Sequence, residues 1–124
     1  SKRLDENIGT VDYDGLIVTN EPVADVVTVT LAASQGVLAR GTVITGAAGG
    51  ELSAAAAALV ATNAVYILAD ETDTGTGTAV TATAYRTGHF ARNKLSTDGS
   101  YTLVAADEEI VRNAGILLSD ALDY

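Results

Sequence analysis

The sequence has no cysteine and no tryptophan, and its 124 residues include one histidine, one phenylalanine and one proline. Without cysteine, neither a disulfide framework nor thiol chemistry contributes to the fold or the function. Basic residues are also few, because seven Lys and Arg stand against sixteen Asp and Glu, for a net charge of −9. Nucleic-acid binding requires clustered Lys and Arg, so this balance argues against a nucleic-acid partner.

Long apolar segments are missing as well. No apolar run approaches the roughly 18 residues that a membrane helix needs. The charged N-terminus, Ser1–Glu6, has no apolar region behind it of the kind that a signal peptide carries. We therefore expect a soluble, cytoplasmically synthesised chain without a membrane partner, and its length fits one small domain.

Aliphatic and β-branched residues dominate what is present, since hydrophobic residues make up 48% of the chain but aromatic residues only 5%. Val, Ile and Thr favour strands, because a branched Cβ packs well on a pleated surface. The sequence therefore predicts a mainly β fold. The expected strands span residues 26–31, 37–44, 64–69, 78–86 with an extended continuation to 92, and 116–118.

One helix is predicted, over Ala105–Asn113, with acidic residues in its first turn and Arg112 in its last. Gly115 stands where a helix C-terminus commonly takes a positive φ angle. The alanine-rich segment Ser53–Ala61 leaves two interpretations open, a loop or a short helix of about two turns. Gly and Asp predict a turn over Asp70–Gly77.

The first 25 residues differ from the rest, because Asp, Glu, Asn and Gly are dense and the apolar residues follow neither a helical nor an alternating pattern. We interpret residues 1–25 as a flexible arm and residues 26–124 as the β-rich domain. An ordinary first strand at Leu16–Thr19 with a frayed tail is the alternative. The apolar residues expected to anchor the arm on a partner are Ile8, Val11, Tyr13, Leu16, Ile17 and Val18.

The motifs of enzymes and metal sites are absent from the sequence. His89 is the single histidine, and no Gly-x-Ser-x-Gly motif accompanies it. The acidic turn that begins at Asp70 has Thr at the third, fifth and twelfth positions, so it fails the EF-hand pattern. The segment Gly46–Gly50 lacks the lysine of a phosphate-binding loop. We therefore predict no catalytic residue, no metal site and no cofactor.

The strand that ends at Phe90 supplies the expected core. Strict alternation would place Tyr85, Thr87 and His89 on one face and Arg86, Gly88 and Phe90 on the other, if no bulge intervenes. Phe90 is the only phenylalanine, so its burial should matter more than that of any single Val. The predicted core anchors are Phe90, Tyr85, Ile67 and Leu68.

Four features in a fixed order carry a resemblance to a known family. They are the strand Ile67–Ala69, the acidic Thr-rich turn 70–78, the strand ending Tyr85–Phe90, and the helix closing on Ala114–Ile116. In order and spacing this chain resembles the head decoration, or capsid cement, proteins of tailed phages over about residues 36–118. The arm departs from that family's best-known member, because it has one proline and more acidic residues, and residues 119–124 extend past the last strand.

The resemblance implies a β-tulip-like small barrel or sandwich with a short C-terminal helix and an N-terminal arm. It also implies a homotrimer on the outer surface of the virion capsid, bound to the major capsid protein, and made in the host cytoplasm. The expected function is a non-enzymatic cement that stabilises the expanded shell. The alternatives are a head-fibre or receptor-binding module displayed on a virion, and a small enzyme or ligand-binding β-domain.

Overall fold

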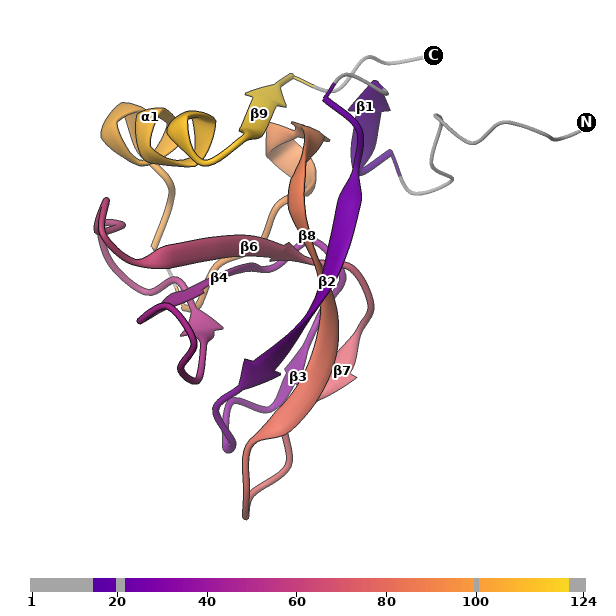
Figure 1. Ribbon diagram of the computed structural model, residues 1–124, viewed down its shortest axis with the longest axis vertical. Coiled ribbons are helices and arrows are strands. Elements are labelled where there is room, and N and C mark those ends of the chain that lie inside the picture. The colour runs from indigo at the N-terminus through magenta and orange to yellow at the C-terminus, as the bar shows by residue number, and fades with distance from the viewer. Residues whose placement is uncertain (1–14, 20–21, 100, 121–124) are drawn as a thin grey trace, which may run out of the picture.

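The computed structural model describes residues 15–19, 22–99 and 101–120. This part of the chain forms nine strands, one short 3-10 helix and one α-helix, and the longest strand is β8 (Figure 1). The strands are β1 (Ile17–Thr19), β2 (Asp25–Leu31), β3 (Val37–Leu38), β4 (Val43–Gly46), β5 (Ser53–Ala54), β6 (Ala64–Leu68), β7 (Thr72–Asp73), β8 (Val80–Ala91) and β9 (Ile116–Ser119). The helices are η1 (Arg92–Lys94) and α1 (Ala105–Asn113). The predicted mainly β fold with one short C-terminal helix is confirmed.

Strand β8 is the central element, and it runs through the molecule from one end to the other (Figure 1). Its first half pairs with β2 from Val80 to Thr87, and β6 pairs with it at Ala84 and Tyr85. Its second half pairs with β1 in the antiparallel direction and with β9 in the parallel direction. The alternating Thr, Ala and Val residues of this strand suit such a position between neighbours.

Five strands close into a ring around one of two cores. The strands β2, β8, β6, β4 and β5 pair in that order, and Leu31 of β2 then bridges to Leu52 before β5. Two backbone hydrogen bonds of 2.9 Å make this closure, one from the Leu52 N–H to the Thr30 carbonyl and one from the Ala32 N–H to the Leu52 carbonyl. The buried side chains inside are Val29, Leu31, Ile44, Leu52, Leu68 and Ala84.

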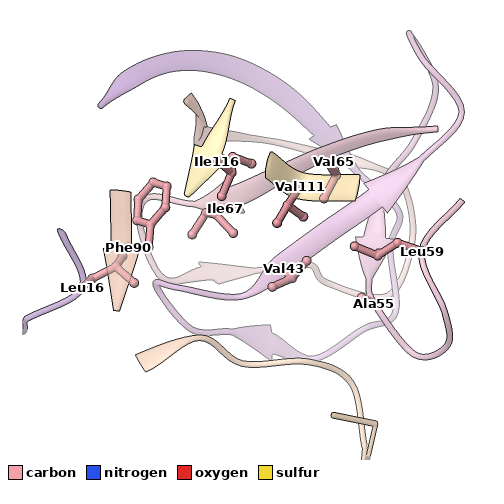
Figure 2. Close-up of a cluster of buried hydrophobic side chains, with 9 residues drawn as sticks. All are labelled: Leu16, Val43, Ala55, Leu59, Val65, Ile67, Phe90, Val111 and Ile116. Atoms are coloured by element: carbon pink, nitrogen blue, oxygen red, sulfur yellow. The ribbon is translucent and has the colours of Figure 1, made fainter. Parts of the chain in front are cut away.

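The other core joins β1, β8, β9 and α1 to β4 and β6. Its buried members are Leu16, Val43, Ala55, Leu59, Val65, Ile67, Phe90, Val111 and Ile116. Figure 2 shows Leu16 and Phe90 at one end of this cluster and Ala55 and Leu59 at the other, with Ile67, Ile116 and Val111 between them. Of the predicted core anchors, Phe90, Ile67 and Leu68 are fully buried and Tyr85 is half-buried.

The predicted face assignment of the Tyr85–Phe90 strand is wrong. Asp25 of β2 lies opposite Thr87, but Val26 lies opposite Tyr85, so Arg86 is an extra residue in β8. Such a bulge shifts the alternation by one position. Tyr85 and Phe90 consequently approach each other, with ring centroids 5.4 Å apart, and both pack against the same core.

Gly88 allows the Phe90 ring to fold back over the strand. The φ angle of Gly88 is +151°, and a Cβ atom added there would lie 2.6 Å from Cζ of Phe90. Gly88→Ala should therefore destabilise the protein by about 1–3 kcal/mol, the usual cost of overpacking a core. Urea unfolding measures this loss, and Gly77→Ala is the matched control, because a Cβ there meets nothing within 4 Å. Equal stability of the two variants would contradict the proposed contact.

The remaining predicted elements agree with the structure except in two segments, 37–44 and 70–77. The helix has the predicted bounds, and strands occupy the predicted regions 26–31, 64–69 and 78–92. The strand predicted over 37–44 is instead split into β3 and β4, because the chain turns at Gly41, whose φ is +95°. The turn predicted over 70–77 contains β7, which pairs with β3.

The alanine-rich segment 53–61 forms β5 and a loop, so of the two open interpretations the helix is excluded. Its backbone N–H groups bond elsewhere in the fold. The Ala54 N–H donates to Oε1 of Gln35, the Ala55 N–H to the Val43 carbonyl, and the Leu59 N–H to Asp107. Tertiary partners therefore replace the bonds that a helix would have made, which outweighs the helix propensity of alanine.

Candidate functional site

The six apolar residues predicted to anchor the arm divide into two groups. Ile8, Val11 and Tyr13 lie outside the described residues. Leu16 is only 1% exposed and belongs to the core around Phe90. Ile17 and Val18 are half-buried in β1, so a strand does form within the Leu16–Thr19 segment that the alternative interpretation named.

The start and the end of the described chain lie together at one end of β8. Ile17 of β1 is opposite Phe90, and the Ala91 N–H donates to the Leu16 carbonyl at 2.8 Å. Strand β9 pairs with residues 88–91 of the same strand, and Figure 1 shows β1 and β9 near this end. We call the part formed by β1, β9 and residues 88–91 the terminal end.

His89 bridges the two flanking strands of the terminal end. Its Nδ1 lies 3.3 Å from Oγ1 of Thr19 in β1, and its Nε2 lies 2.9 Å from Oγ of Ser119 in β9. A histidine that activates a serine needs its other ring nitrogen oriented by an acid, as in hydrolase triads. Here a threonine hydroxyl faces that nitrogen. The arrangement therefore fits a structural link between strands.

Arg92 connects α1 to the terminal end through ion pairs. Its Nε and Nη2 atoms lie 2.7 and 2.9 Å from the two carboxylate oxygens of Glu108, and Nη1 lies 2.6 Å from Oδ1 of Asp120. The hydrogen bonds to Glu108, opposed by desolvation and aided by Asp120, hold the pKa of Arg92 above its usual value. This guanidinium is therefore a fixed positive charge that connects β8, α1 and the residue after β9.

Neither of two shallow hollows among the described residues gathers catalytic groups. One of about 320 Å³ lies between the start of β6, Arg86, Thr87 and Ala114. Its one charged residue, Arg86, is paired with Asp25 at 2.5 Å. The other, of about 200 Å³, is lined by β2, Gly49, Gly50 and β6 without any charged side chain.

The described part of the chain has neither a metal-binding cluster nor a membrane-spanning helix. No group of three or more His, Asp or Glu residues there is placed to hold a metal ion. No helix in the described residues is long and apolar enough to cross a membrane.

Comparison with protein families decides the class. A family model described as "Bacteriophage lambda head decoration protein D" matches residues 7–117. The chain belongs to this family. A search of curated protein sequences gives no match. The matched region spans both cores, α1, β1 and the first two residues of β9, and it includes residues 7–14 ahead of β1.

Membership of the head decoration family fixes the broad function. The protein is a structural component of the phage virion that decorates the outside of the capsid, and it is not an enzyme. The resemblance found in the sequence is thereby confirmed. Two features of the decoration protein have no signal in the sequence, the buried carboxylate of Asp107 and the exposure of Val60 and Val104.

Proposed function

We propose that this decoration protein binds the expanded phage head as a homotrimer and stabilises the shell, with residues 1–14 as the arm that contacts the major capsid protein. The family match supports the decoration role. The terminal end is consistent with an arm that stops before Leu16, because Leu16 is held in the core and β1 pairs with β8. The arm proposed from the sequence is thus shortened from 1–25 to 1–14.

A homotrimer suits a short arm on energetic grounds. Ordering a backbone residue costs roughly 1–2 kcal/mol, so a single arm with the few anchors Ile8, Val11 and Tyr13 would bind weakly. Three arms on one trimer make the second and third attachments to the shell intramolecular, which raises the avidity by about 10²–10⁴. A trimer would therefore bind the head tightly even though each arm binds weakly.

Removal of residues 1–14 should abolish binding to heads without unfolding the domain. The deletion leaves Leu16 and the whole of both cores in place. Binding is measured by mixing the protein with undecorated, expanded heads and sedimenting them, and folding is measured by thermal melting. A deletion of residues 1–22 is the contrasting variant, because it removes Leu16 and β1 and should lower the melting temperature. Full head binding by the 1–14 deletion would contradict the arm assignment.

Addition of the intact protein to undecorated heads should raise their resistance to heat. The expected result is a higher disruption temperature that saturates with protein concentration, measured by calorimetry of decorated and undecorated heads. The alternative function, a receptor-binding module, predicts instead that the purified protein binds host cells and leaves the disruption temperature of the head unchanged.

A further inference from the structure

One side of the domain exposes an apolar surface made of two chain segments. We call it the Ala–Val face, and it consists of the exposed residues of 56–61 and 104–106. Val60 and Val104 are 52% and 53% exposed, whereas the other exposed valines, Val23, Val26 and Val37, lie outside these two segments. The exposed residues around them are all alanines, at 56–58, 61, 105 and 106.

A single buried carboxylate holds the two segments of the Ala–Val face together. Oδ1 of Asp107 accepts a hydrogen bond of 2.9 Å from the Leu59 N–H, and Oδ2 accepts one of 2.9 Å from the Val104 N–H. Asp107 itself is fully buried. The face is therefore preorganised, and a partner that binds it loses little free energy to the ordering of loops.

The Ala–Val face is also free of charge in a strongly acidic chain. No Asp, Glu, Lys or Arg occurs from residue 52 to 69 or from 99 to 106, although the net charge is −9. Copies of such a chain repel one another, so their contact is least opposed where neither surface carries a charge. A basic partner would instead gain most from the acidic surfaces elsewhere.

We propose that copies of the chain contact one another through the Ala–Val face, around the threefold axis of the homotrimer. This inference rests on the proposed function. In a cyclic assembly, equivalent residues of different copies contact one another only near the symmetry axis. An uncharged face of alanine and valine can approach its own copies there without steric or electrostatic conflict.

The position of the Ala–Val face gives this assembly a consequence for the arms. Ala55 and Leu59 lie beneath the face, whereas Leu16 and Phe90 lie at the other end of the same core (Figure 2). The described part of each copy would therefore begin, beside Leu16, far from the axis of the trimer. We expect the arms that precede it to engage separate places on the shell.

The variants Val60→Glu and Val104→Glu test the inference. Each places an acidic group where three copies would meet, and we expect at least tenfold weaker association in sedimentation velocity with unchanged thermal melting of the monomer. Val26→Glu is the matched control, because Val26 is 51% exposed and lies on β2, outside the Ala–Val face. The control should associate as the wild-type protein does.

A charge-swap mixture tests the placement at the axis. Val60→Glu and Val60→Lys should each associate poorly. An equimolar mixture should recover part of the association, because each mixed trimer has two opposite-charge pairs and one like-charge pair at the axis, whereas a trimer of one variant has three like-charge pairs. Wild-type association by both glutamate variants, or dissociation by Val26→Glu as well, would overturn the inference. So would a mixture that associates no better than either variant alone, or a Val60→Glu trimer that no longer binds heads.

Failure of this inference is distinguishable from failure of the proposed function. Wild-type protein that forms trimers and binds heads upholds the proposed function whatever the variants do. If the wild-type protein is monomeric in solution, the same variants are compared by their occupancy on expanded heads. Lower occupancy of Val60→Glu than of Val26→Glu then supports the inference, and equal occupancy overturns it.

Discussion

Phe90→Ala is expected to lower the free energy of unfolding by about 3–5 kcal/mol, the range for removing a buried aromatic ring. The ring is fully buried, packs against Tyr85, and lies in the core that joins β1 and β9 to α1. Small domains have a total stability of roughly 5–15 kcal/mol, so this loss could unfold the protein at physiological temperature. No other phenylalanine and no tryptophan is present to compensate.

Urea unfolding followed by circular dichroism measures the effect of Phe90→Ala, and the neighbouring substitution His89→Gln is the control. Glutamine can still reach one of the two hydroxyl groups that His89 bridges, and each such bond contributes only about 0.5–1.5 kcal/mol net. We expect a small change in stability and unchanged binding to heads. A silent Phe90→Ala combined with a His89→Gln variant that loses head binding would contradict both assignments.

Local signals in the sequence predicted several elements correctly. The helix Ala105–Asn113 was predictable because acidic residues at its start, Arg112 at its end and Gly115 beyond it all act within a few residues. The region of β8 was predictable because alternating Thr and small apolar residues suit a strand with neighbours on both edges. The burial of Phe90 followed from composition alone.

The errors came from interactions between distant segments. The bulge at Arg86 depends on the register of β8 with β2, which no local pattern reveals. The loop at 53–61 depends on acceptors from Gln35, Val43 and Asp107, which lie far away in the sequence. Leu16 joins the core because β1 pairs with the end of β8, a contact between segments more than 60 residues apart that no local pattern reveals.

The candidate site was predictable only at the level of the family, and the arm stays a prediction. The order of four short motifs indicated the head decoration proteins, and the family match confirms it. The Ala–Val face was not predictable, because an alanine-rich segment beside apolar residues is as typical of a buried element as of an exposed one. Its exposure follows from the loop that Asp107 fixes.

Asp107→Ala should also destabilise the protein strongly, by about 2–5 kcal/mol, because it leaves the buried N–H group of Leu59 and the partly buried N–H group of Val104 without acceptors. The carboxylate further accepts a hydrogen bond from the Tyr101 hydroxyl. Asp107 is the third residue of α1, and Val104 before the helix has no side-chain oxygen. The carboxylate therefore supplies the N-terminal cap that the local sequence lacks.

The stabilising effect of Asp107 should depend on pH in a predictable direction. Burial alone would favour the neutral acid, but the hydrogen bonds from Tyr101, Val104 and Leu59 outweigh it and hold the pKa of Asp107 below its usual value. A carboxyl with a lowered pKa in the folded state stabilises above its unfolded pKa of about 3.9, and the stabilisation is lost as the pH falls through the folded value.

Asp107→Asn isolates this contribution from those of the other acidic residues, of which the chain has fifteen besides Asp107. Asparagine keeps the size of the side chain and one acceptor oxygen but cannot titrate. The wild-type protein should be clearly more stable than Asp107→Asn at pH 7, and the difference should shrink as the pH is lowered below 4 (about the unfolded pKa). Urea unfolding at a series of pH values gives this difference directly. A difference that stays constant from pH 7 down to about pH 2 would show that the ionisation of Asp107 contributes nothing, and that the difference comes from the second acceptor oxygen, which asparagine lacks.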